Sequence, residues 1–263
     1  MTLIKNILGR VFALWALIIF VPTMIVAFIF IALAGLWKEP RSTQVFQAVS
    51  RTWMRVFFFF SGIRISIKGK ENFRKGENYV VISNHNSFMD VPLVTPFVPG
   101  ANKTIAKSEL AKIPVFGLIY KRGSVLVDRK SDESRKASLG KMKEILRIGM
   151  HMCIYPEGTR NKTDKPLQYF HNGAFKLAID NGKAILPAVI FNTAEVLPAN
   201  KSFFFWPIKK IRMHFLEPIP VEGLSVEELK NRSFEIMKDY YVAHRFPAMP
   251  GDDQRSPVDD RDR

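Results

Sequence analysis

The residues best suited to chemistry lie in the segment from Asn84 to Asp90, directly after a short apolar run. His85 can act as a general base near neutral pH, and a base needs a partner that sets its tautomer and stabilises its charged form. Asp90 can be that partner, like the carboxylate of a serine-protease triad. Residues five apart on one regular helix point about 140° apart. The pair can therefore form if His85 lies in a loop and Asp90 in the first helical turn, with Ser87 as a plausible helix cap.

The same residues also have a purely structural interpretation. Ser87 and Asp90 are spaced as in a capping box, so Asp90 can simply cap a helix, and His85 can be an ordinary surface histidine. Residue type and spacing alone do not decide between catalysis and capping.

A second polar block, Tyr155 to Arg160, also follows an apolar run. Gly158 lets the backbone approach a ligand closely, and Thr159 offers a hydroxyl. Arg160 offers a two-pronged donor that suits a phosphate. Glu157 can hold an arginine in position or accept a hydroxyl. The structural alternative is an ordinary turn that carries a surface Arg–Glu pair.

Two further cations are candidates for binding an anion. Arg129 follows the apolar run from Gly123 to Val127, and Lys107 lies between Ala106 and Leu110. Each is a weak signal by itself, because arginines after strands are common and a lysine at the start of a helix is ordinarily solvated.

Short apolar runs alternate with helical patterns from Arg64 onward, which predicts a layered α/β domain. In an open α/β sheet, the loops that leave the carboxyl ends of strands usually form the site, and both polar blocks occupy such loops. Ser225 and Glu228 have the spacing of a capping box at the start of a final helix. Strands are expected at 64–68, 79–83, 123–127, 152–155, 184–191 and 211–215, and helices at 131–148, 173–180 and 224–243.

An uncharged run, Val11 to Trp37, exceeds the roughly 20 apolar residues that cross a bilayer. It is also longer than the roughly 7–15-residue core of a signal peptide, so we expect a retained anchor. Pro22 either kinks one tilted helix or marks the turn of a re-entrant pair. We expect a membrane anchor and amphipathic helix at 1–63, an α/β domain at 64–246 and a disordered tail at 247–263.

Two aromatic segments allow two interpretations each. Ser42 to Ile63 has helical spacing, and this helix either lies flat on a membrane or packs on the α/β domain. Phe203 to Trp206 is either an interfacial loop or a buried strand.

The formal net charge of +15 indicates an anionic partner, which can be nucleic acid, a phospholipid surface or an acidic carrier. Cys153 is the one cysteine, so no intrachain disulfide can form. The other histidines lack metal-ligand spacing, and no Walker loop, dinucleotide fingerprint or Gly-x-Ser-x-Gly elbow is present. We therefore expect neither a metal nor a cofactor. If His85 is a base, the nucleophile must come from a substrate.

In order along the chain, the motifs resemble those of the glycerolipid acyltransferase family, and within it the bacterial-type 1-acylglycerol-3-phosphate O-acyltransferases. The resemblance extends over roughly residues 79–191. Its four blocks are Asn-His-x4-Asp at His85 to Asp90, Gly-x5-Arg at Gly123 to Arg129, Glu-Gly-Thr-Arg at Glu157 to Arg160, and an apolar strand around Pro187. Four ordered motifs are far more specific than any one of them.

This resemblance implies an α/β acyltransferase domain and a role for each matched residue. His85 would remove the proton of an acceptor hydroxyl, and Asp90 would orient His85. The hydroxyl oxygen would attack the acyl thioester of coenzyme A or acyl carrier protein, with no acyl-enzyme intermediate. The product of acylating lysophosphatidic acid is phosphatidic acid. The residues implied in substrate binding are Lys107, Arg129, Glu157, Gly158, Thr159 and Arg160.

The expected partners are thus a lysophospholipid acceptor, an acyl-CoA or acyl carrier protein donor, and a membrane. Nucleic acid is disfavoured by the anchor and by the lack of a recognition motif. We expect a bacterial inner membrane, with the catalytic domain on the cytoplasmic side where both donors occur. Two alternatives are an acyltransferase for a lyso-ornithine lipid or glycolipid, and a non-catalytic adaptor that binds anionic membranes.

Overall fold

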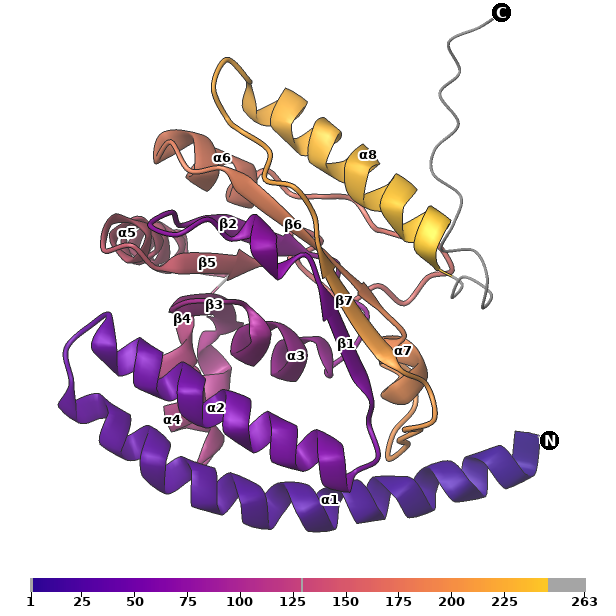
Figure 1. Ribbon diagram of the computed structural model, residues 1–263. Helices are drawn as coiled ribbons and strands as arrows, with labels where there is room; N and C mark the ends of the chain where they lie inside the picture. Colours follow the sequence, from indigo (N-terminus) through magenta and orange to yellow (C-terminus); the bar gives the residue numbers. More distant parts are fainter. Residues whose placement is uncertain (1, 129, 246–263) are drawn as a thin grey trace, which may run out of the picture.

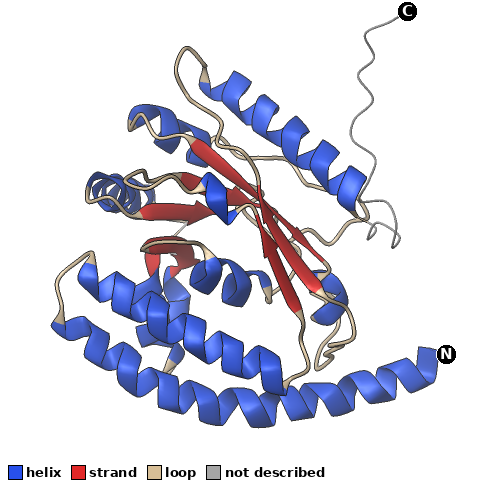
Figure 2. Ribbon diagram, in the orientation of Figure 1, coloured by secondary structure: helices blue, strands red, loops and turns tan. Residues whose placement is uncertain are grey.

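Uninterrupted apolar runs form the central strands, because a parallel sheet covered on both faces buries both sides of each strand. Every residue of β2 (Val80–Ser83), β5 (His151–Ile154) and β6 (Ile185–Phe191) is buried. The computed structural model describes residues 2–128 and 130–245, in which these strands lie at the centre of a seven-stranded sheet (Figures 1 and 2).

The strand order is β1-β7-β6-β2-β5-β3-β4. The outer strands are β1 (Ile65–Lys68), β3 (Asn102–Lys107), β4 (Ser124–Val127) and β7 (Ile211–Phe215). Among the described strands, β6 and β7 pair antiparallel and every other neighbouring pair is parallel. The carboxyl ends of β2, β3, β4, β5 and β6 therefore lie at one edge of the sheet.

Helices cover both faces of the sheet (Figure 1). One layer contains α1 (Thr2–Leu33), α2 (Arg41–Phe60), α3 (Asp90–Phe97), α4 (Phe116–Gly123) and α7 (Thr193–Val196). The other contains α5 (Asp132–Arg147), α6 (Gly173–Asp180) and α8 (Val226–His244). Short 3₁₀ helices occupy Ala34–Leu36, Lys70–Asn72 and Ser108–Lys112. Alternate side chains of the central strands β2, β5 and β6 enter the two core clusters, one on each face.

The six strands and three helices expected in the α/β domain lie within one or two residues of the observed ones, and α8 begins with the predicted Ser225–Glu228 capping box. The helix expected from Ser42 to Ile63 is α2, which ends three residues earlier. Strand β3 is not predicted from the sequence. Its sequence is polar, yet Asn102 and Thr104 are buried, and Gln47 of α2 donates from Nε2 to the backbone oxygen of Asn102 at 2.9 Å. Hydrophobic patterning cannot detect a strand whose buried face is polar.

The N-terminal helix continues through Pro22, so the chain does not turn there. The proline has no N–H to donate, so one backbone hydrogen bond of the helix is missing at this position. The chain reverses between α1 and α2, and α2 runs back along α1 (Figure 1).

The second helix packs on the α/β domain instead of standing apart from it. Phe46, Trp53 and Phe57 are buried in the core cluster on this face of the sheet, whereas Phe59 and Phe60 are exposed. Arg51 links α2 to α3, because its Nε donates a hydrogen bond to the backbone oxygen of Pro96 in α3 at 2.8 Å.

The aromatic segment at 203–206 is a loop and contains no strand. Phe204 and Phe205 are buried beneath the start of α1, where Phe205 N donates to Gly9 O at 2.9 Å, and Phe203 is exposed. The division of the chain at residues 63 and 246 stays a prediction, and the expected tail at 247–263 lies outside the described residues.

The first helix buries one face and exposes the other. Ala16, Ala27 and Ile31 enter the core cluster, so α1 lies against the domain. The segment Leu3–Leu36 is long and apolar enough to cross a membrane. Its exposed large apolar residues include Ile4, Ile7, Val11, Leu14, Ile18, Ile25, Ile29 and Phe30. Such an apolar outer face indicates association with a membrane.

Candidate active site

His85 and Asp90 meet where β2 ends and α3 begins. His85 lies in the loop after β2, and Asp90 is the first residue of α3. Nδ1 of His85 lies 2.8 Å from Oδ2 of Asp90. Because an ionised carboxylate can only accept, Nδ1 carries the hydrogen in this contact. The other ring nitrogen, Nε2, is then the one with a free lone pair that can take a proton.

The same carboxylate oxygen also closes the turn into the helix. Oδ2 of Asp90 accepts hydrogen bonds from the backbone N–H groups of Asn86 and Ser87, both at 2.7 Å. Orientation of the histidine and capping of the turn are therefore one arrangement and not competing alternatives. Ser87 is not the helix cap that its type suggested, because its Oγ donates to Leu197 O and α3 begins only at Asp90.

Glu157 holds the two loops of the site together. Its Oε1 accepts from the backbone N–H of His85 at 2.8 Å, and its Oε2 accepts from that of Gln168 at 3.0 Å. Asn161 N adds a bond to His85 O at 2.6 Å. Burial raises the pKa of Glu157 to about 7; the two backbone donors lower it and the nearby Asp90 raises it. The carboxylate is turned toward the main chain, which makes it suited to positioning His85.

Gly158 and Arg160 are placed by contacts that the sequence motif does not reveal. Gly158 has a φ of +67°, and a Cβ there would lie 3.0 Å from the ring of His171. The guanidinium of Arg160 lies over the ring of Phe88, 3.4 Å from its centroid, which brings the two polar blocks together. Nη1 of Arg160 is buried without a hydrogen-bond partner within the described residues.

The remaining predicted residues are less closely joined to this cluster. Lys107 is the last residue of β3 and is exposed at the same edge of the sheet, and Thr159 is exposed beside Gly158. Arg129 lies outside the described residues; β4, which precedes it, also ends at this edge.

Comparison with known proteins decides the family. A sequence model of the Acyltransferase family matches residues 64–191. The chain is 32% identical over 199 residues to the 1-acyl-sn-glycerol-3-phosphate acyltransferase of Borreliella burgdorferi, covering 73% of this chain and 76% of that protein. The chain belongs to the glycerolipid acyltransferase family.

The chain is also similar to a second bacterial enzyme in sequence and to a solved structure in fold. The 1-acyl-sn-glycerol-3-phosphate acyltransferase of Haemophilus influenzae is 24% identical over 74% of this chain and 78% of its own length. The crystal structure of the 1-acyl-sn-glycerophosphate (LPA) acyltransferase PlsC from Thermotoga maritima superposes with a TM-score of 0.76 at 24% identity, covering 92% of this chain and 99% of that one. This structural similarity shows that the chain has the acyltransferase fold.

Asn84 and Tyr155 belong to the two polar blocks of the sequence, but no role is predicted for either of them. Asn84 is fully buried; it donates from Nδ2 to Ile190 O and accepts from Ile190 N, which pins the His85 loop to β6. Tyr155 stacks on His85, with ring centroids 4.2 Å apart. Both directly follow a strand next to a predicted site residue, which is the signal that could have found them.

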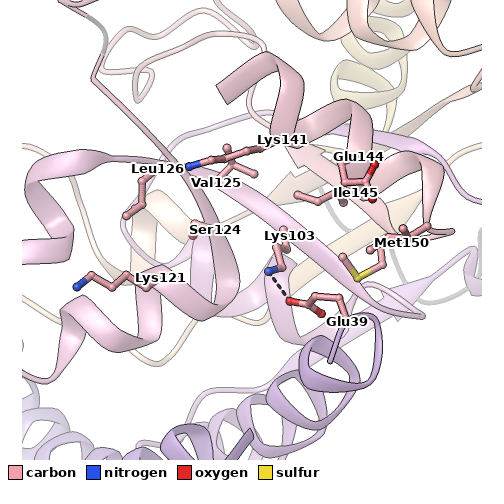
Figure 3. Close-up of a pocket in the computed structure, with 11 residues that line it drawn as sticks. Glu39, Lys103, Lys121, Ser124, Val125, Leu126, Lys141, Glu144, Ile145 and Met150 are labelled. Atoms are coloured by element: carbon pink, nitrogen blue, oxygen red, sulfur yellow. Dashed lines mark hydrogen bonds and ion pairs between the residues drawn. The ribbon is translucent and has the colours of Figure 1, made fainter. Parts of the chain in front are cut away.

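A cavity of about 460 Å³ lies elsewhere, between β3, β4 and α5 near the start of α2 (Figure 3). Lys103 and Glu39 both line it and form an ion pair, with 2.7 Å between Nζ and Oε1. Lys103 pairs with Met152 near the start of β5, so the cavity lies toward the amino ends of these strands. None of the predicted site residues lines it, so this cavity is separate from the candidate active site.

Proposed function

We propose that this acyltransferase moves an acyl group from a thioester donor to the sn-2 hydroxyl of 1-acyl-sn-glycerol-3-phosphate, which forms phosphatidic acid. The names of the relatives supply the acceptor. The observation that carries the chemistry is the 2.8 Å contact between His85 Nδ1 and Asp90 Oδ2, because it leaves Nε2 of an oriented imidazole as the base.

The proposed reaction needs no protein nucleophile. Nε2 of His85 takes the hydroxyl proton as the acceptor oxygen attacks the carbonyl carbon of the thioester. The C–S bond then breaks, and the thiolate leaves with the proton that His85 returns. Asp90 stabilises the imidazolium in between, because its carboxylate is buried and lies at hydrogen-bond distance from Nδ1. An ester replaces a thioester, and the protein ends in its starting protonation state.

The cationic side chains of the site are proposed to bind the phosphate of the acceptor. Arg160 offers a planar guanidinium held against Phe88, and Thr159 and Gly158 offer a hydroxyl and a closely approachable backbone. Lys107 and Arg129 are proposed as further cations on the strength of their motifs. We assign Glu157 to the positioning of His85, since both of its carboxylate oxygens accept from backbone N–H groups.

We also propose the location of the enzyme. The apolar outer face of α1 is suited to the membrane in which a lysophospholipid resides. Both candidate donors occur in the cytoplasm, so we place the catalytic edge of the sheet on the cytoplasmic side of a bacterial inner membrane.

Acyl transfer to lysophosphatidic acid by purified wild type and His85→Ala tests the reaction, with acyl-CoA and acyl carrier protein donors offered separately. Loss of a general base should lower kcat about 10²–10⁴-fold. His244→Ala, which changes an exposed histidine at the end of α8, should retain wild-type activity. An His85→Ala variant as active as wild type would refute the mechanism. An inactive wild type would redirect the search to other lyso-lipid acceptors.

Labelling of Thr159→Cys with a membrane-impermeant maleimide tests the location. Thr159 is exposed, whereas Cys153 is buried and burial raises the pKa of its thiol, so background labelling should be slow. We expect labelling in lysed cells but not in intact spheroplasts. Equal labelling in both would put the site on the outer side.

A further inference from the structure

Tyr155 and His85 form a stacked pair of rings at the catalytic edge of the sheet. Their centroids are 4.2 Å apart and their planes are 22° from parallel. His85 lies two residues beyond the end of β2, and Tyr155 directly follows β5. Because β2 and β5 are parallel neighbours, the two residues follow adjacent strands at the same edge of the sheet.

The hydrogen bond to Asp90 cannot by itself set the direction of Nε2. It fixes the Nδ1 atom, but the imidazole plane can still turn about the line that joins Nδ1 to Oδ2. A flat aromatic ring against one face of the imidazole removes that freedom. The direction of Nε2 is therefore set by the two contacts together.

The π face of Tyr155 also matches the charge that develops on His85. When Nε2 takes a proton the ring becomes an imidazolium, and an aromatic face at this distance attracts a cation. The side chain of His85 is 18% exposed, so water screens this attraction only in part.

We propose that Tyr155 is a positioning residue for His85, whose ring holds the imidazole plane and supports the imidazolium formed during acyl transfer. The proposal rests on the proposed function, because it requires His85 to be the base. It assigns this role to the aromatic ring and not to the phenolic hydroxyl.

The surroundings of the hydroxyl support this division. Tyr155 Oη is buried and has no hydrogen-bond partner within the described residues. The side chain packs against the core cluster that includes Cys153, on the face of the sheet covered by α1 to α4. Burial, together with the charge of Asp90, raises the pKa of Tyr155 well above its usual value, so the hydroxyl stays neutral.

Three substitutions separate the ring from the hydroxyl. Tyr155→Phe keeps the ring and should keep kcat within about twofold of wild type. Tyr155→Leu removes the ring and should lower kcat on the order of tenfold, with KM for lysophosphatidic acid unchanged, because a cation–π contact contributes at this level. Tyr155→Met replaces the leucine variant if that variant does not fold.

Tyr79 provides a matched control within the same chain. It stacks on His151, with centroids 5.7 Å apart and planes 4° from parallel, at the amino ends of β2 and β5. Tyr79→Leu deletes the same atoms from a Tyr–His stack remote from the catalytic edge. It should lower the Tm without lowering kcat of the folded enzyme.

A spectroscopic measurement reports the contact directly. The Cε1 proton of His85, assigned by comparison with His85→Ala, should show a ring-current shift in wild type and in Tyr155→Phe that disappears in Tyr155→Leu. The double variant His85→Ala/Tyr155→Leu should be no slower than His85→Ala alone.

Several outcomes would overturn the proposal. These are wild-type kcat in Tyr155→Leu, an equal loss in the phenylalanine and leucine variants, or an equal loss of kcat in Tyr79→Leu. A fully active His85→Ala would instead refute the proposed function, so the two failures are distinguishable.

Discussion

The carboxylate of Asp90 joins His85 across the boundary between a loop and the first turn of α3. One oxygen, Oδ2, accepts from His85 Nδ1 and from the backbone N–H groups of Asn86 and Ser87. The backbone bonds hold the loop in a conformation in which His85 and Asp90, five residues apart in sequence, pair. The turn geometry thus places a base and its partner at the sheet edge.

Asp90→Asn should therefore be defective in catalysis more than in binding. The amide retains an acceptor but lacks the negative charge that stabilises the imidazolium, so we expect kcat to fall about 10²–10⁴-fold. Steady-state kinetics with lysophosphatidic acid checks this. Asp180→Asn, in an ion pair on α6, is the control and should be fully active. A kcat within threefold of wild type would show that the carboxylate is dispensable.

Glu157→Gln should lose stability and activity together. Glutamine offers one acceptor oxygen, so either His85 N or Gln168 N would face an amide donor, at a cost of about 1–3 kcal/mol. Urea unfolding and kcat measure the two effects. Glu195→Gln, in an exposed pair with Lys209, should change neither. A raised KM for the acceptor at unchanged stability would assign Glu157 to substrate binding instead.

Gly158→Ala should impair the site through the backbone. Alanine is strained at a φ of +67° and would contact His171, so we expect a cost of about 1 kcal/mol or more. Gly149→Ala is the matched control, because its φ is +82° but no atom lies within 4 Å of the added Cβ. Both variants should unfold at lower temperature, and Gly158→Ala alone should lose kcat/KM. Equal kcat/KM in the Gly158→Ala and Gly149→Ala variants would show that Gly158 has no role in the site.

His151 should make the fold sensitive to acid. It is buried between Phe73 and Tyr79, and its Nδ1 accepts from Tyr79 N at 3.0 Å; burial lowers its pKa from 6.5 to about 4. The unfolded chain takes up this proton near pH 6.5. Stability that is fully present above about pH 6.5 is therefore lost as the pH falls toward 4, by about 3 kcal/mol.

The variant His151→Asn isolates this contribution. His214 and Glu157 also titrate abnormally, but they are present in both proteins and cancel in the difference. The free energy of unfolding of wild type minus that of the variant, measured from pH 4 to 8, should rise with pH and level off above about 6.5. A difference independent of pH would contradict the expectation.

Charge on the outer face of α1 should release the enzyme from membranes. Ile18 and Ile25 are more than half exposed, so Ile18→Glu/Ile25→Glu should fold normally. Each buried charge costs about 2–3 kcal/mol or more in a bilayer. Co-sedimentation with phosphatidylglycerol vesicles should fall at least tenfold. Ala137 is an exposed residue of α5, so the control variant Ala137→Glu should sediment like wild type. Undiminished sedimentation of the double variant would show that α1 is not the membrane-facing element.

The sequence by itself determined the elements and the order of the motifs. Apolar runs long enough for buried strands, helical spacing between them and the Ser225 capping box are local patterns, so six strands and the helices α5, α6 and α8 lie within two residues of their predicted bounds. Four motifs in order also sufficed to indicate the family. The spacing allowed His85 to pair with Asp90 only if His85 lies in a loop and Asp90 in the first helical turn, and this is the arrangement observed.

Only the tertiary structure decided which side chains meet across the motifs. The stacking of Tyr155 on His85, the contact of Phe88 with Arg160 and the bond from His85 N to Glu157 join segments about 70 residues apart. The strand order β6-β2-β5 creates these contacts by placing the ends of distant strands side by side. The burial of α2 and the polar strand β3 were decided in the same way, because each depends on a partner surface that no local pattern describes.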